Sequence, residues 1–135
     1  MPVGSTAVSV RLRWLFMAKI KILNRTRGTV LATEADVADT SRKRNVGLLK
    51  HKSLPAGQGL WIVPCEGIHT FGMKFAIDVV FLDRKKKVMK VRPDMGRRRI
   101  SLSLLAHSVL ELPAGTAAAT GLRKGDELEF EETAG

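Results

Sequence analysis

The sequence predicts a mainly β fold, namely a compact β-sandwich or small barrel with one or two short helices. Short stretches in which polar and apolar residues alternate recur along the chain, which is typical of half-buried strands. Glycine, asparagine, aspartate and proline residues separate these stretches at short intervals, as turns between strands require. The chain has 135 residues, of which 44% are hydrophobic and 27% are charged. This size and composition suit one domain with a single core.

Strands are expected where apolar residues alternate with polar ones, or form short runs bounded by turn residues. The clearest hairpin joins the run Ile77–Leu82 to Val88–Val91 through a turn at 83–87. Alternation within that run places Asp78 on the same strand face as Val80 and Leu82. The other strands are predicted at Lys19–Leu23, Thr29–Val37, Gly59–Pro64, Ser108–Leu112 and Leu128–Phe130.

Two short helices are expected between these strands. The second covers residues 115–120 and ends at Gly121, because glycine readily takes the left-handed conformation that stops a helix. The first begins at Thr40 or Ser41, either of which can cap it, and its apolar face carries Val46, Leu48 and Leu49.

Residues 17–135 are expected to form the single domain, after an N-terminal extension of residues 1–16 that we expect to be poorly ordered. The extension lacks a regular period, and either Met1 or Met17 could serve as the start. The longest apolar stretch near the N-terminus, Trp14–Ala18, is shorter than the roughly 20 residues of a spanning helix and the roughly 7 residues of a signal-peptide core. We therefore expect no membrane span and a cytoplasmic location.

Blocks along the chain match a known family in order, spacing and residue type. They are ADT at 38–40, GL at 47–48 and 59–60, CEGIHTFGMKFAIDVVFLD at 65–83, LELPAG at 110–115 and GLRKGDEL at 121–128. On these blocks the chain resembles the domain of unknown function 192 (DUF192) family from about Val37 to Phe130. The resemblance implies a compact, mainly β domain, and it implies no activity. The arginine-rich stretch 95–103 departs from the family pattern.

Cys65, His69 and Asp78 have the side chains best suited to catalysis or metal binding. The C-x3-H spacing could hold a metal, or could pair a thiol with a base. Cys65 is the only cysteine, which excludes an intrachain disulfide. A metal site needs three or four ligands, and His51 and His107 are distant in sequence. We expect no metal, no cofactor and no catalytic residue; a small enzyme using Asp78 with His69 or Cys65 is the alternative.

Asp78 lies in an otherwise apolar strand, where a carboxylate is costly unless it is paired or hydrogen-bonded. An arginine or lysine could pair with it, or loop amides could donate to it. In the third interpretation it is a poised carboxylate in a ligand pocket shared with His69 and Met73.

Charge is unevenly distributed over a chain whose net charge is +10. Residues 84–99 contain nine basic residues and one acid, whereas residues 111–135 contain two basic residues and six acids. Within the predicted loop Arg97–Ser103, three arginines offer forked contacts to phosphate or carboxylate. Nucleic acid is not the expected partner, because aromatic residues are only 5%, there is no tyrosine, and no recognition motif accompanies the charges.

The sequence therefore predicts a small non-catalytic binding module for an anionic ligand or an acidic protein surface. We expect it to be a monomer or weak dimer. Weak, non-specific nucleic-acid binding is the second alternative. The ligand-binding residues predicted are His69, Met73, Asp78, Arg97, Arg98 and Arg99.

Overall fold

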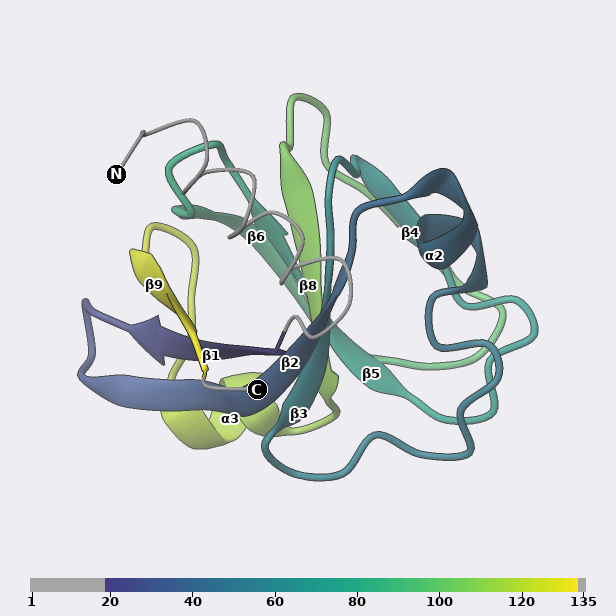
Figure 1. Ribbon diagram of the computed structural model, residues 1–135, viewed down its shortest axis with the longest axis horizontal. Coiled ribbons are helices and arrows are strands. Elements are labelled where there is room, and N and C mark those ends of the chain that lie inside the picture. Colours follow the sequence, from purple (N-terminus) through teal and green to yellow (C-terminus); the bar gives the residue numbers. More distant parts are fainter. Residues whose placement is uncertain (1–18, 134–135) are drawn as a thin grey trace, which may run out of the picture.

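The computed structural model describes residues 19–133, so the predictions made for residues 1–16 lie outside the described residues. The regular secondary structure of the described chain is mostly strand, with two short helices (Figure 1). The strands are β1 (Lys19–Asn24), β2 (Thr29–Ala38), β3 (Gln58–Ile62), β4 (Gly67–His69), β5 (Ile77–Leu82), β6 (Val88–Met95), β7 (Ile100–Leu102), β8 (Ser108–Pro113) and β9 (Leu128–Glu132). The helices are α2 (Ser41–Val46) and α3 (Thr116–Thr120). The predicted fold class, mainly β with one or two short helices, is confirmed.

Seven strands form one sheet in the order β6-β5-β8-β3-β2-β1-β9. The pair β2–β3 is parallel and the other neighbours are antiparallel. The sheet curls until its edge strands meet at one end (Figure 1). There the backbone N–H of Val88 donates to the carbonyl of Asp126 at 2.8 Å, and the backbones of Lys87 and Glu127 form an isolated antiparallel β-bridge. The result is a partly closed barrel, which leaves few sheet-edge groups unpaired at that end.

Both faces of the curled sheet are covered at β5, so every residue of this strand is buried, including Asp78. Val80 and Leu82 pack inside the curl with residues of β1, β2 and β8. The alternate residues Ile77, Val79 and Phe81 pack on the outer face, beneath the segment that contains α2 and β4. The predicted alternation of β5 is therefore confirmed.

The turn between β5 and β6 is held by Asp83, whose Oδ1 accepts hydrogen bonds from the backbone N–H groups of Lys85 and Lys87 at 2.8 and 2.9 Å. This arrangement is a common way for aspartate to stabilise a tight turn. The hairpin predicted between Ile77–Leu82 and Val88–Val91 is confirmed, and its second strand extends to Met95.

Both predicted helices form. Gly121 ends α3 in the left-handed conformation, with its N–H donating to the carbonyl of Ala117. Thr40 caps α2 by accepting from the N–H of Lys43 at 3.1 Å. This helix ends at Gly47, so the apolar Leu48 follows the helix instead of extending its face.

A second, two-stranded sheet pairs β4 with β7 and lies over the outer face of the main sheet. The prediction that Arg97–Ser103 is a loop is wrong for Ile100–Leu102, which forms β7. A three-residue strand is too short to show a period, and its pairing with Gly67–His69 joins segments about thirty residues apart.

Candidate ligand pocket

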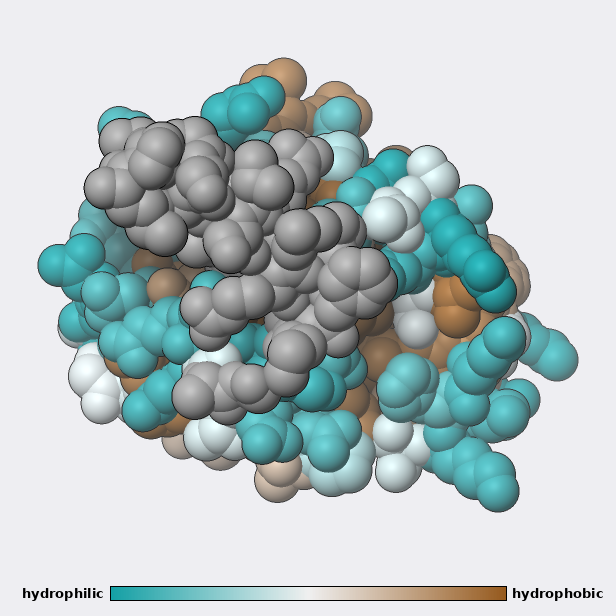
Figure 2. Space-filling view, in the orientation of Figure 1, coloured by the Kyte–Doolittle hydropathy of each residue, from teal (hydrophilic) through white to brown (hydrophobic). Residues whose placement is uncertain are grey.

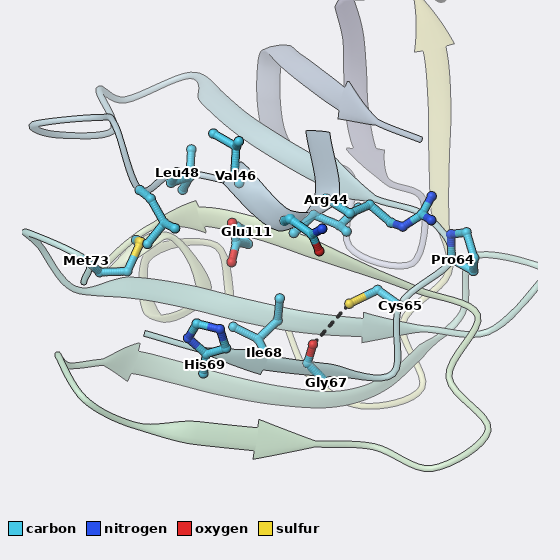
Figure 3. A pocket seen from close by; sticks show the side chains of 14 residues that line it. Arg44, Val46, Leu48, Pro64, Cys65, Gly67, Ile68, His69, Met73 and Glu111 are labelled. Atoms are coloured by element: carbon cyan, nitrogen blue, oxygen red, sulfur yellow. Dashed lines mark hydrogen bonds between the residues drawn. The ribbon is translucent and has the colours of Figure 1, made fainter. Parts of the chain in front are cut away.

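A pocket of about 310 Å³ lies between the α2 segment and the two-stranded sheet, above the outer faces of β3 and β8 (Figure 3). This volume is at the small end of the range for ligand sites. Its apolar wall includes Leu48, Ile62 and Met73. Its polar and chemically reactive lining comes from Arg44, Asn45, Cys65, His69 and Glu111.

Glu111 supplies a buried acidic group to the pocket. Alternation along β8 turns Leu110 and Leu112 into the core inside the curl and Glu111 towards the outer face. The residue is only 4% exposed. Its Oε1 has no hydrogen-bond partner among residues 19–133. Burial raises the pKa of Glu111 to about 7, because the ionised form is poorly solvated there.

Cys65 lies on the same pocket wall and is half-buried. Its Sγ donates a hydrogen bond to the carbonyl of Gly67 at 3.1 Å. Burial raises the pKa of the Cys65 thiol, and the nearby Glu111 carboxylate raises it further. A thiol that resists ionisation is a poor nucleophile. The arrangement therefore gives little support to covalent chemistry at Cys65.

His69 and Met73, two of the predicted ligand-binding residues, both line this pocket. Met73 is buried on the apolar side, whereas His69 is exposed at the rim with its ring 5.6 Å from that of Phe71. Figure 3 shows the Arg44 guanidinium turned towards Pro64 and away from Glu111. The carbonyls of Asp39 and Val63 hold that guanidinium, at 3.0 and 3.3 Å.

Asp78 is not part of the pocket lining. It is fully buried, and its carboxylate accepts hydrogen bonds from three backbone N–H groups. Asp94 and Gly115 donate to Oδ1 at 2.8 and 3.2 Å, and Ala117 donates to Oδ2 at 2.7 Å. Of the interpretations open from the sequence, hydrogen bonding by backbone amides is the one observed, although only Gly115 lies outside a strand or helix, since Asp94 is in β6 and Ala117 is in α3. Asp78 joins β5 to the end of β6 and to the start of α3.

Arg97, Arg98 and Arg99 are all exposed on the turn that leads into β7. Thr70 holds this turn, because its Oγ1 accepts from the N–H of Arg99 and donates to the carbonyl of Gly96, at 2.8 and 2.6 Å. The pairing of His69 with Ile100 brings the turn beside the pocket rim. The three arginines are outside the lining itself.

Residues 19–133 contain no group of three or more His, Cys, Asp or Glu side chains placed to hold a metal ion. No helix among them is long and apolar enough to cross a membrane.

Glu111 is the pocket residue that sequence reasoning missed. The same argument that singled out Asp78 applies to it, because a glutamate between Leu110 and Leu112 is also an acid in an apolar strand. The structure separates the two acids: backbone N–H groups surround the Asp78 carboxylate, whereas a cavity adjoins that of Glu111.

Comparison with known proteins agrees with this fold. The DUF192 family model, described as "Uncharacterized ACR", matches residues 22–130. A UPF0127 protein of Pyrococcus furiosus is 31% identical over 81% of this chain and 97% of its own length. A crystal structure of a protein of unknown function from Novosphingobium aromaticivorans superposes with a TM-score of 0.71 at 19% identity, covering 82% of this chain and 83% of that one. Another crystal structure, from Sinorhizobium meliloti and described as that of a candidate transcription regulator, superposes with a TM-score of 0.73 at 19% identity. It covers 84% of this chain and 92% of that one.

Proposed function

The chain belongs to the DUF192 family, and we propose from the chemistry of its own pocket that it is a non-catalytic binding module for a small organic anion. The observation that carries the proposal is Glu111, a buried carboxyl whose Oε1 has no hydrogen-bond partner among residues 19–133 and which adjoins the pocket. A buried polar group of this kind costs stability, so its presence is better explained by a ligand than by packing.

The partial protonation of Glu111 favours a ligand that carries a hydrogen-bond acceptor. With a pKa of about 7, roughly half of the molecules carry the neutral acid at pH 7. A neutral carboxylic acid can donate one O–H hydrogen bond, which a carboxylate oxygen of the ligand can accept. The apolar wall at Leu48, Ile62 and Met73 suits an apolar body attached to that carboxylate.

Positive charge near the rim supports an anion over a neutral acceptor. This charge is on the turn of Arg97, Arg98 and Arg99, which lies beside the rim residue His69. The chain also carries a net charge of +10, which attracts anions at long range. His69, Met73 and the arginine turn thus keep the ligand roles proposed from the sequence. Asp78 does not, because three backbone N–H groups already occupy its oxygens.

Calorimetric titration with benzoate, benzyl alcohol and benzylamine tests the proposal, since these probes share an apolar ring and differ in the polar group. Benzoate should bind most tightly, and its affinity should rise as pH falls through about 7, because the anion prefers protonated Glu111. Glu111→Leu should weaken benzoate binding about tenfold, by loss of one buried hydrogen bond. If benzylamine bound most tightly, with an affinity that rises with pH, the ligand would be a cation and the proposal would be wrong.

Two variants separate Glu111 from the rest of the pocket. Glu111→Gln keeps an N–H donor but cannot titrate, so benzoate should still bind, with a flatter pH profile than in the wild type. The difference between the two pH profiles gives the contribution of Glu111. Glu129→Gln is the matched control, because Glu129 is exposed on β9. If the benzoate affinity of Glu111→Leu equalled that of the wild type, the proposed role of Glu111 would be contradicted.

The alternative enzyme would use Cys65 or His69 without Asp78. Both residues line the same pocket, but the raised pKa of Cys65 disfavours the thiolate. Cys65→Ala should therefore keep full benzoate binding. We further propose that the protein is a monomer or weak dimer and that it is cytoplasmic. Analytical ultracentrifugation tests the oligomeric state.

A further inference from the structure

A cluster of exposed apolar side chains covers the outer face of the β4–β7 sheet and the loop after it. Leu104 and Leu105 are 79% and 88% exposed. Among residues 19–133, Val30 on β2, at 47%, is the one exposed large hydrophobic residue outside the cluster. We call the cluster the apolar face; its members are Phe71, Ile100, Leu102, Leu104 and Leu105.

The pairing of β4 with β7 explains why this face is apolar. Ser101 is buried, so its neighbours Ile100 and Leu102 point outward together. Leu102 pairs with Gly67, whose lack of a side chain leaves room for the leucine to lie across it. Among residues 19–133, no layer of protein therefore covers Ile100 or Leu102 on the outer face of the small sheet, and each is 60% exposed.

Hydrogen bonds hold the loop that presents Leu104 and Leu105. The N–H of Ser103 donates to the carbonyl of Glu66 at 2.9 Å, and the N–H of Leu105 donates to the Glu66 carboxylate at 3.1 Å. Leu105 has a φ of 68°, a conformation that a leucine rarely adopts. Figure 2 shows a hydrophobic projection at the top of the molecule, where Figure 1 places the loop leading into β8. The fold thus holds two leucines outward at a defined position.

Positive charge borders the apolar face. Arg97, Arg98 and Arg99 are exposed immediately before Ile100. On another side, the Nζ of Lys90 donates to the carbonyl of Leu102 at 2.8 Å. The nearby acid, Glu66, already accepts a hydrogen bond from the loop.

We propose that the apolar face docks on the surface of an anionic lipid bilayer. The leucines would enter the boundary between headgroups and acyl chains, and the arginines would contact lipid phosphates. A second copy of the chain fits poorly, because it would bring two arginine turns of like charge together. An acidic protein fits less well than a bilayer, since the leucines project from a loop and do not line a groove. This inference shares the arginine turn with the proposed pocket function, but the apolar face that carries it is not part of the pocket lining.

Sedimentation with vesicles tests the docking, using the full chain. At ~0.1 M salt the protein should bind vesicles of phosphatidylcholine mixed with phosphatidylglycerol, and bind vesicles of phosphatidylcholine alone far more weakly. The double variant Leu104→Ser/Leu105→Ser should bind the mixed vesicles at least about tenfold more weakly, because two apolar side chains no longer insert. Val30→Ser is the matched control and should bind like the wild type.

A second pair of variants tests the charges. Replacing Arg97, Arg98 and Arg99 with alanine should reduce partitioning by about a hundredfold, since each charge near an anionic membrane contributes a factor of about five. The control replaces the exposed Arg25, Arg123 and Lys124 with alanine, which removes the same charge elsewhere. A smaller loss in the control is expected. Thermal melts verify that each variant folds.

Three results would overturn the proposal. The first is equal vesicle binding by the leucine variant and Val30→Ser. The second is concentration-dependent self-association that the leucine variant abolishes, which would assign the face to a second copy. The third is binding to polyglutamate but not to mixed vesicles, which would assign it to an acidic protein.

Discussion

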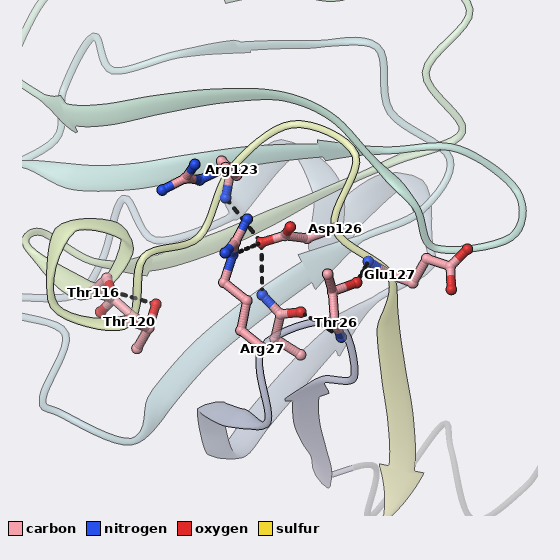
Figure 4. A network of polar contacts seen from close by, with 8 residues as sticks. Thr26, Arg27, Thr116, Thr120, Arg123, Asp126 and Glu127 are labelled. Atoms are coloured by element: carbon pink, nitrogen blue, oxygen red, sulfur yellow. Dashed lines mark hydrogen bonds and ion pairs between the residues drawn. The ribbon is translucent and has the colours of Figure 1, made fainter.

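The Nε of Arg27 lies 2.8 Å from Oδ2 of Asp126 and joins the turn after β1 to the turn before β9 (Figure 4). The side chain of Asn24 and the backbone N–H of Arg123 donate to the same oxygen, at 2.8 and 3.0 Å. The carbonyl of Asp126 in turn accepts from Val88 at the start of β6. One aspartate thus connects the two edges of the curled sheet.

We expect Asp126→Asn to lower the free energy of unfolding by about 2 kcal/mol, since hydrogen bonds to a charged acceptor are lost. Burial alone would raise the pKa of Asp126, but Arg27, Asn24 and the N–H of Arg123 more than offset it, and the pKa lies below its ordinary value. The ionised network therefore stabilises the fold above the ordinary aspartate pKa, and this stabilisation is lost as pH falls through the lower folded value. Urea unfolding at several pH values measures it. Arg25→Ala, at an exposed position of the same turn, should have little effect.

Asp78→Asn should cost about 1.5–3 kcal/mol of unfolding free energy, because the amide replaces a charged acceptor that binds three N–H groups. Asp36→Asn is the control. Asp36 makes an exposed ion pair with Lys19, so its loss should cost less than about 1 kcal/mol. Similar losses in the two variants would contradict the structural role assigned to Asp78.

Glu111→Gln should change the pH dependence of stability. The folded pKa of Glu111 is about 7 against an ordinary 4.5, so the neutral acid is favoured on folding. Its contribution is fully present below the ordinary pKa and is lost as pH rises through the folded one, by about 3 kcal/mol in all. Glutamine stays neutral, so the variant should be more stable than the wild type at pH above about 8 and similar to it below about 5. Denaturant unfolding across this range measures the difference; parallel curves would show that Glu111 does not titrate on folding.

Retention on heparin and on duplex DNA should be weak, non-specific and steeply reduced by salt, because each neutralised phosphate releases about 0.9 counterion. The variant with Arg97, Arg98 and Arg99 replaced by alanine should elute at lower salt. Sequence-selective duplex binding that survives ~0.2 M salt would favour nucleic acid as the partner. Equal elution of variant and wild type would show that the three arginines take no part.

Much of the main sheet follows from local pattern. The two faces of β5, the turn at Asp83 and the end of α3 at Gly121 all depend on residues adjacent in the chain, so periodicity and turn chemistry predict them. The β4–β7 sheet could not be predicted in this way. Its strands are three residues each, and they are stable as a pair because Ile68 and Ser101 turn inward.

The candidate pocket was likewise predicted only in part from the sequence. The residues alone identify His69 and Met73 as lining candidates, and they show that Asp78 needs partners. Only the tertiary structure shows that those partners are the N–H groups of Asp94, Gly115 and Ala117, up to 39 positions away. It also distinguishes Asp78 from Glu111, two acids in similar apolar strands.

The sequence by itself determined the fold class, the alternation that buries β5 on both faces, and the concentration of positive charge between Arg84 and Arg99, because each is a property of neighbouring residues. The tertiary structure alone decided that β6 meets β9, that Glu111 adjoins a cavity, and that the leucines of the apolar face lie beside the arginine turn. These three outcomes depend on contacts between segments that are distant in the chain. Local propensity carries no information about such contacts until the sheet has curled and packed.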